Sequence, residues 1–254
     1  MSTTTADAPS MNHPEVGPRG SWKRRFRSLV EILLALGIAT DQLALLILSP
    51  LGVAADPLRS VIALAGVTTL SSCLLLALLG VLLRLRGEAP MPFLLGARRS
   101  IRGEVARGLL LIPLIFLGLY FFKSGFRHLL PGLYTGEKNV LEELMRGPWD
   151  LALFVAVVLF TGGMREEVQR AFVIRRFEQG LGPATLGAFL YAVFFGFGHL
   201  IQGRDEAIMA GILGLLWGLL FAARRSVVAP AVSHGLYDAL ELIRYYAFGP
   251  LRVL

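Results

Sequence analysis

The feature that most constrains this chain is a series of apolar blocks, each about 20 residues long. An α-helix rises 1.5 Å per residue, so such a block spans the hydrocarbon core of a bilayer, which is roughly 30 Å thick. The blocks lack strand-like alternation, and prolines fall at or near their ends, where a helix tolerates them best. We expect helical spans over residues 28–49, 59–83, 106–123, 149–178, 183–201, 205–223 and 227–247.

Composition supports a membrane protein over a soluble one. Of the 254 residues, 55% are hydrophobic and only 17% are charged, against about a quarter in typical soluble domains. A soluble fold of this length would need a charged surface that this chain does not supply. The sequence therefore predicts an all-α membrane protein, a bundle of about seven transmembrane helices. The single cysteine, Cys73, excludes a disulfide framework and a cysteine metal cluster.

The chain divides into a short tail and one long membrane domain. Residues 1–27 are rich in Ser, Thr, Pro and Ala and end in a basic stretch, so we expect a disordered basic N-terminal tail. Residues 28–254 form the multi-span membrane domain. The core of this domain, at about 148–247, carries the motifs with ionisable residues inside the apolar spans.

The net charge of +7 comes from Arg and Lys placed between the apolar blocks. That distribution is typical of topology signals and of contact with anionic lipid headgroups, and it argues against nucleic acid as a partner. The basic groups at 24–27, 84–107, 175–176 and 224–225 fall on one side of a seven-span bundle. The positive-inside rule then places the N-terminus in the cytoplasm.

Ionisable residues inside a bilayer are costly, so those within the spans are functional candidates. Three spans hold them: Arg165, Glu166, Glu167 and Arg170, then His199, then His234 and Asp238. Glu166 and Arg170 are four residues apart, as are His234 and Asp238, so each pair shares a helix face. Glu31 and Asp41 in the first span are interpreted as helix-packing or headgroup contacts.

Three short motifs occur in these spans. They are Glu166-Glu167-Val168-Gln169-Arg170-Ala171-Phe172, Phe195-Gly196-Phe197-Gly198-His199 and His234-Gly235-Leu236-Tyr237-Asp238. In this order they resemble the motifs of the CAAX prenyl protease type II and bacteriocin-processing family, also called CPBP or Abi. These are intramembrane endopeptidases of the type that removes the last three residues of prenylated proteins. The resemblance implies a peptide or protein substrate, which is prenylated in the CAAX type of these enzymes. It also implies a location in a bacterial inner or plasma membrane.

The first motif departs from the family pattern by one residue. The family usually has three residues between the second Glu and the Arg, and this chain has two. Aligning the glutamates keeps Glu166 and Glu167 in the motif. Aligning Arg170 instead puts Arg165 where the water-activating carboxylate belongs. We prefer the first register, because a general base must be a carboxylate.

The resemblance also implies roles for the motif residues. Glu166 would take a proton from the attacking water, because a carboxylate in a poorly solvated cavity has a raised proton affinity. His199 would orient that water or bind a metal, and His234 and Asp238 would line the oxyanion side or complete the metal shell. Arg170 would hold Glu167 or Glu166 in place.

Metal binding stays open at this level. Glu166, His199 and His234 supply donors that suit a divalent metal such as zinc, although the H-E-x-x-H signature of many zinc proteases is absent. Direct metal ligation and metal-free catalysis by glutamate and histidine therefore both fit the sequence.

Two other classes compete with the endopeptidase. One is an inactive family member that acts as a membrane scaffold or as self-immunity against a peptide toxin, in which Glu166 and Arg170 form an ordinary buried ion pair. The other is a small transporter that uses these side chains as a proton relay. A transporter of that kind predicts inverted repeats with broken helices, and the sequence shows none.

Overall fold

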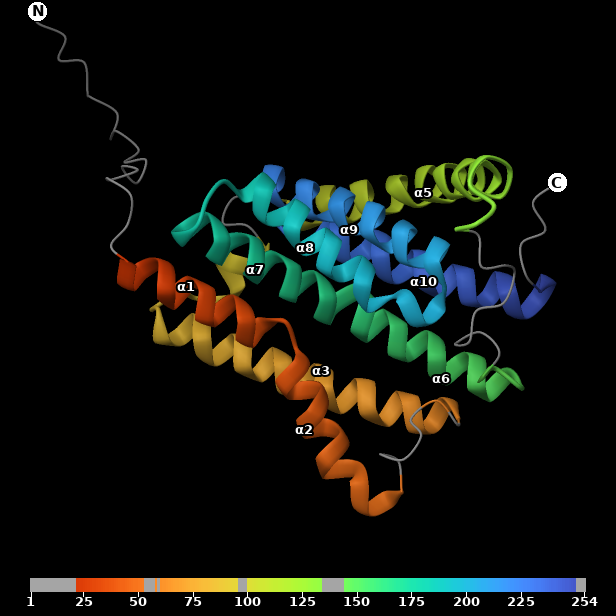
Figure 1. The fold of residues 1–254 in the computed structure, drawn as a ribbon, viewed down its shortest axis with the longest axis horizontal. Coiled ribbons are helices and arrows are strands. Elements are labelled where there is room, and N and C mark those ends of the chain that lie inside the picture. The colour runs from red at the N-terminus through yellow and green to blue at the C-terminus, as the bar shows by residue number, and fades with distance from the viewer. Residues whose placement is uncertain (1–21, 53–57, 59, 96–99, 134–143, 250–254) are drawn as a thin grey trace, which may run out of the picture.

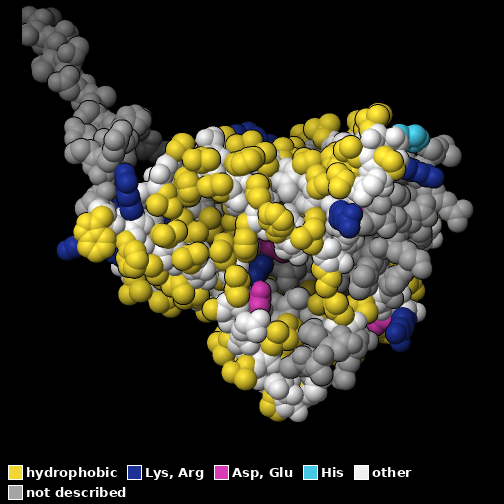
Figure 2. Space-filling view, in the orientation of Figure 1, with side chains coloured by type: hydrophobic (Ala, Val, Ile, Leu, Met, Phe, Trp, Pro, Cys, Tyr) yellow, Lys and Arg dark blue, Asp and Glu magenta, His cyan; other side chains and the backbone are white. Residues whose placement is uncertain are grey.

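A computed structural model describes residues 22–52, 58, 60–95, 100–133 and 144–249. Over these residues the protein is a bundle of helices joined by short connections, without a β-strand (Figure 1). The all-α class predicted from the apolar blocks is confirmed. Large hydrophobic side chains cover much of the outer surface, as a protein surrounded by lipid requires (Figure 2).

The N-terminal half supplies a broken first helix and two long ones. Its elements are α1 (Trp22–Ala35), α2 (Ile38–Leu48), the short 3₁₀ helix η1 (Ser49–Leu51), α3 (Val61–Leu85), α4 (Pro90–Leu95) and α5 (Ile101–Leu129). The break between α1 and α2 falls at Gly37, whose φ of 90° is a left-handed conformation that glycine adopts readily. Ser60 and Ser100 cap α3 and α5, since each side chain accepts a backbone N–H of the first turn.

The C-terminal half contains the segments that carry the three motifs. Its elements are α6 (Pro148–Val158), the π-helical segment η4 (Leu159–Glu166), α7 (Glu167–Gly180), α8 (Ala184–Gly198), η5 (Leu200–Gln202), α9 (Arg204–Arg224) and α10 (Val228–Phe248). The first three form one uninterrupted helical stretch. The widened turns of η4 end on Glu166, and π-helical turns occur frequently at functional sites.

Each predicted span coincides with a helical segment, and four of them are long and apolar enough to cross a membrane. These four are Trp22–Leu51, Val61–Leu85, Ile101–Leu129 and Arg204–Arg224. Of the other three, α8 has only 15 residues, while the α6–α7 stretch and α10 carry the ionisable motif residues. The protein is thus a helical membrane protein, and the full set of seven crossings stays a prediction.

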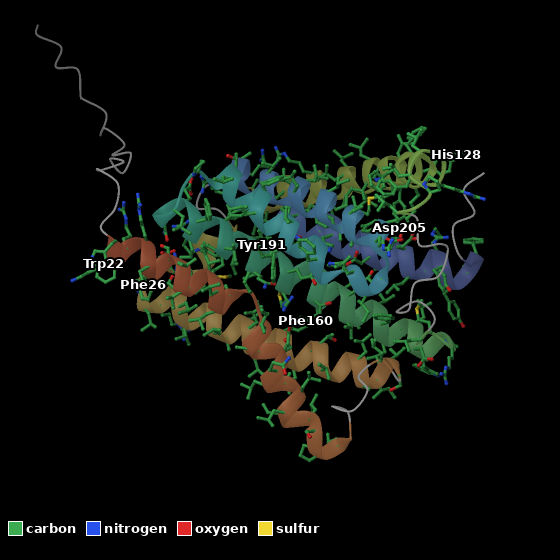
Figure 3. All side chains as sticks on the ribbon, in the orientation of Figure 1. Trp22, Phe26, His128, Phe160, Tyr191 and Asp205 are labelled. Atoms are coloured by element: carbon green, nitrogen blue, oxygen red, sulfur yellow. The ribbon has the colours of Figure 1, made fainter. Side chains whose placement is uncertain are left out.

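The expected boundary of the N-terminal tail differs from the observed one. Helix α1 begins at Trp22, so the basic stretch 22–27 is helical rather than disordered. Its apolar residues recur at helical spacing between the arginines, which stabilises an amphipathic helix at an interface. Trp22 and Phe26 project from this end of α1 (Figure 3). Residues 1–21 of the predicted tail lie outside the described residues.

Arginines of two of the predicted basic groups meet at one end of the bundle, in an assembly that we call the arginine cluster: Glu31, Arg86, Glu88, Arg175 and Arg176. Arg176 is fully buried, and its guanidinium lies 2.6 Å from both the Glu31 and the Glu88 carboxylates. Arg86 lies 2.9 Å from Glu31 as well. Arg176 is therefore more than a topology marker, because it joins α7 to α1 and to the segment after α3. Glu31 makes the helix-packing contact that we expected for it.

Candidate active site in the helical bundle

A cavity of about 520 Å³ opens in the half of the bundle away from the arginine cluster. Its wall includes Glu166 of η4, His199 at the end of α8, and His234 and Asp238 of α10. Apolar side chains of α3, α6 and α9 line much of the remainder. The structure therefore brings residues of all three motifs to one cavity, and Figure 2 shows a hollow with charged side chains at its edge in the region between α3 and α6.

Behind this cavity wall lie Glu167 and Arg170, and together with His234 of the wall they form one buried group. The Glu167 carboxylate accepts hydrogen bonds from the Arg170 guanidinium and from His234 Nδ1, the latter at 2.7 Å. The side chains of Glu167 and Arg170 are each 1% exposed. A buried charge is tolerated only when it is paired and hydrogen-bonded, so these two residues depend on each other.

Aromatic rings complete the surroundings of Arg170. Its Cζ atom lies 4.7 Å from the ring centre of Phe195, 5.4 Å from that of Trp217 and 5.7 Å from that of Tyr191, which is in the middle of α8 (Figure 3). The negative faces of aromatic rings attract a desolvated guanidinium. Phe195 belongs to the second motif, so this contact joins the first and second motifs.

His234 is held on three sides. Its ring stacks on Trp217 with centroids 3.8 Å apart, and Trp217 is itself fixed by a hydrogen bond from its indole N–H to Ser233. Because Nδ1 faces Glu167, Nε2 points to the cavity carboxylates, 3.4 Å from Asp238 and 3.8 Å from Glu166. When Nδ1 donates to Glu167, Nε2 is an acceptor in the neutral ring and a donor in the doubly protonated ring.

The two adjacent glutamates occupy different environments. The side chain of Glu166 is 18% exposed and lines the cavity, whereas that of Glu167 is 1% exposed and lies behind it. The π-helical turns that end at Glu166 place consecutive carboxylates on opposite sides of the wall. This geometry is compatible with the register that keeps both glutamates in the motif, and the catalytic roles of Glu166, Glu167 and Arg170 stay predictions.

His199 closes another part of the wall. It follows the last residue of α8, and its Nδ1 lies 2.8 Å from the Phe195 carbonyl oxygen, which accepts that N–H in one tautomer. In that tautomer Nε2 is available to a molecule in the cavity. The F-x-x-x-H spacing thus has a local cause: the ring caps the turn that begins at the aromatic residue.

Two glycines let η4 approach α10 closely. A Cβ atom on Gly163 would lie 3.2 Å from the Gly235 Cα and from the Ala231 carbonyl oxygen. A Cβ on the neighbouring Gly162 would overlap the Asp238 carboxylate. Small residues at a membrane-helix crossing allow this close contact, and here they bring the first and third motifs together.

The donors predicted to bind a metal have the right chemistry but are not assembled as a metal site. Glutamate and two histidines suit zinc. Within the described residues, however, no three His, Cys, Asp or Glu side chains are grouped in a way that would hold an ion. Ligation of a metal by Glu166, His199 and His234 therefore stays a prediction.

The structure also adds residues that the motifs did not indicate. Asp41 was expected to contact helices or headgroups, yet it lines the cavity and accepts a hydrogen bond from Ser71. Arg165 and the ion pair of Lys123 with Glu206 line it too. A charge in an otherwise apolar span was the available signal for Asp41. Nothing in the sequence placed it beside η4.

Comparison with known proteins agrees with the motifs. Residues 147–240 match the family model described as type II CAAX prenyl endopeptidase Rce1-like. The matched segment begins just before α6 and includes all three motifs. A search of curated proteins and a search of solved structures found no match. Residues 147–240 of this membrane protein are therefore similar to the type II CAAX prenyl endopeptidases.

Proposed function

We propose that this protein is an intramembrane endopeptidase in which Glu166 activates the water that attacks a peptide bond. The observation that supports the proposal is that the two adjacent glutamates have different positions beside His234. Glu166 faces the cavity 3.8 Å from His234, while Glu167 fixes the other side of the same ring at 2.7 Å. A cavity-facing carboxylate beside an oriented imidazole is the arrangement that general acid–base catalysis needs.

The proposed reaction uses only side chains of this chain. Glu166 takes one proton from water as the water oxygen bonds to the carbonyl carbon of the substrate. His199 orients the water, and His234 and Asp238 lie on the side where the oxyanion develops. A doubly protonated His234 keeps Nδ1–H on Glu167 and donates Nε2–H to the oxyanion. Glu166 then returns its proton to the leaving amine as the carbon–nitrogen bond breaks.

The family match over residues 147–240 supports a protein or peptide substrate, and we propose a prenylated tail as the first to test. The cavity has apolar side chains beside its charged ones, among them Val67, Phe154 and Leu213. Such a wall suits a substrate with an apolar attachment next to a peptide. Membrane lipids are the other proposed partners, because the outer surface of the bundle is apolar.

One observation favours the inactive alternative, a scaffold or self-immunity protein. Arg170 follows Glu167 by three residues instead of the four usual in the family. Glu167 and Arg170 nevertheless pair, through the i,i+3 contact of one helix turn. The alternative predicts that the wild-type protein cleaves no peptide although its fold is intact.

We also propose that the N-terminus and the arginine cluster face the cytoplasm of a bacterial inner or plasma membrane, as the positive-inside rule predicts. Cysteines at Ser10 and Gly136, introduced singly into a Cys73→Ser protein, should be labelled from opposite sides of sealed vesicles. Labelling from the same side would contradict this orientation.

The proposed function is tested with purified protein in lipid vesicles. Farnesylated and unmodified peptides of one sequence are incubated with it, and mass spectrometry identifies new termini. We expect cleavage that Glu166→Gln abolishes, with the farnesylated peptide the better substrate. Folded wild-type protein that cleaves neither peptide, nor a mixture of other membrane peptides, would favour the inactive alternative.

A further inference from the structure

Arg165 is a cationic side chain in the cavity that the proposed mechanism does not use. It lies in the last turn of η4, immediately before the catalytic carboxylate, and its side chain is 17% exposed. The guanidinium reaches towards the break between α1 and α2. A Cβ atom on Gly37 would lie 2.8 Å from Arg165 Nη2, so the glycine at the break leaves room for it.

The guanidinium lacks the short contacts that the other buried arginines make. Its nearest carboxylates are those of Asp41 and Glu166, each at 3.9 Å, which is beyond hydrogen-bond distance. Its Nε atom is buried and has no hydrogen-bond partner within the described part of the chain. By contrast, the Lys123 ammonium on the same cavity lies 2.6 Å from Glu206. Arg165 thus lines the cavity with a guanidinium to which no described residue is hydrogen-bonded.

A planar guanidinium binds a carboxylate through two parallel hydrogen bonds. We propose that Arg165 binds a carboxylate of the substrate on the leaving-group side of the scissile bond. This inference rests on the proposed peptidase function and adds a specificity residue to it. The C-terminal carboxylate of the substrate and an acidic side chain near that terminus share this chemistry.

The position of Arg165 limits how far that carboxylate is from the bond that breaks. Arg165 Nη1 lies 3.9 Å from Glu166 Oε1, so an anion on the guanidinium is close to the activated water. An extended chain advances about 3.3–3.6 Å per residue, which makes the released segment only a few residues long. Binding the end of the substrate in this way sets where it is cut.

Asp41 attracts the Arg165 guanidinium from 3.9 Å without forming a hydrogen bond to it, so the guanidinium donors stay available to a ligand. Its side chain is 50% exposed and accepts a hydrogen bond from Ser71, so solvent and Ser71 already stabilise its charge. Two groups from the N-terminal helices, Asp41 and the Gly37 break, thereby orient Arg165 from outside the residues that match the family model.

The test compares one cleavable peptide in three forms: with a free C-terminus, with a C-terminal amide, and as an amide with glutamate as its last residue. Wild-type protein should cleave the free acid about 10- to 100-fold better in kcat/KM than the plain amide, since hydrogen bonds to charged groups contribute about 1.5–3 kcal/mol. Arg165→Gln should bring that ratio close to one, because it lowers kcat/KM for the free acid much more than for the amide. Lys123→Met, which changes the paired cation of the same cavity, should keep the wild-type ratio.

The outcomes separate the inference from the function on which it rests. If wild-type protein cleaves none of the peptides, the peptidase proposal fails. If it cleaves acid and amide equally well, or if Arg165→Gln keeps the preference, the role of Arg165 is wrong. If wild-type protein cleaves the amide with a terminal glutamate as well as it cleaves the free acid, a side-chain carboxylate is sufficient for binding to Arg165. Should Arg165→Gln not fold, Arg165→Lys replaces it: the charge remains, and most of the preference should be lost with the two-pronged geometry.

Discussion

The arginine cluster and the cavity both bring charged side chains into the bundle, but they hold them differently. In the arginine cluster, carboxylates and guanidinium groups lie 2.6–3.3 Å apart, and Arg176 is completely enclosed. Around the cavity, Arg165, Glu166 and Asp238 lie 3.4–3.9 Å from their nearest partners. Closed pairs stabilise a fold, whereas charges left apart across a cavity are available to a substrate.

The Glu167, Arg170 and His234 group connects these two ways of holding charge. It is as closely paired as the arginine cluster, yet one of its members presents Nε2 to the cavity. Replacements in the three places should therefore separate effects on activity from effects on stability.

The largest expected effect is that of Glu166→Gln on activity. The amide keeps the shape of the side chain but cannot accept the proton, and positioned acid–base catalysis contributes about 10²–10⁴ in rate. We expect peptide cleavage to fall by at least that factor with little change in melting temperature. Glu241→Gln is the matched control, because Glu241 also lines the cavity but is paired with Arg244. An equal loss of peptide cleavage in both variants would contradict the role of Glu166 as the general base.

Glu167→Gln should act mainly on stability. It leaves the Arg170 guanidinium buried without its counter-charge, and breaking a buried ion pair typically costs about 3–5 kcal/mol. Thermal unfolding in detergent should show this loss, and His234 should also be less firmly oriented. If the variant melts like the wild type but is less active than Glu166→Gln, the two carboxylates have exchanged roles.

A smaller loss of stability is expected for Arg176→Met. Glu31 keeps Arg27 and Arg86 as partners, and Glu88 keeps Arg175, so neither carboxylate is left alone. We expect a destabilisation of about 1.5–3 kcal/mol, the range for losing hydrogen bonds to charged groups. Cleavage per folded molecule should be unchanged. A selective loss of activity would show that the arginine cluster communicates with the cavity.

The smallest effect concerns pH and Glu88, which lies between α3 and α4. Burial acts to raise the pKa of this carboxyl, but the hydrogen bond and charge of Arg176, with smaller contributions from Gln179 and Arg175, bring it below the ordinary value. A lowered pKa in the folded state means that Glu88 stabilises the protein above the unfolded-state pKa of about 4.3 and that this contribution disappears as the pH falls through the folded-state pKa.

Melting temperatures from pH 7 to pH 3 should therefore fall less steeply for Glu88→Gln than for the wild type. Parallel curves would show that Glu88 contributes no pH-dependent stability.

Much of the architecture followed from hydrophobicity, because a membrane helix must satisfy its backbone within itself. The apolar blocks gave the positions of the helices, and the motif residues Glu166, His199 and His234 line one cavity as their spans suggested. The break at Gly37 and the π-helical segment η4 were not foreseen. Both depend on packing between segments distant in sequence, which local patterns do not encode.

The same limit explains the misjudged charges. Arg176 was interpreted as a topology signal because it lies in a basic group between apolar blocks, and only the fold brings Glu31 and Glu88 to it. Asp41 looked like a packing residue, and only the bend after α1 places it by Arg165. The sequence identifies a charged residue within an apolar span, whereas the fold determines whether an oppositely charged side chain lies near it.

The most direct test of the account follows oxygen through a single turnover in H₂¹⁸O, with protein in excess of peptide. If water activated by Glu166 attacks the peptide carbonyl directly, the new C-terminal carboxyl of the product carries one ¹⁸O after the first turnover. Glu166→Gln should form almost no product on the same timescale. Unlabelled product, with ¹⁸O found instead in a carboxylate of the protein, would show a covalent acyl intermediate and contradict direct attack by water.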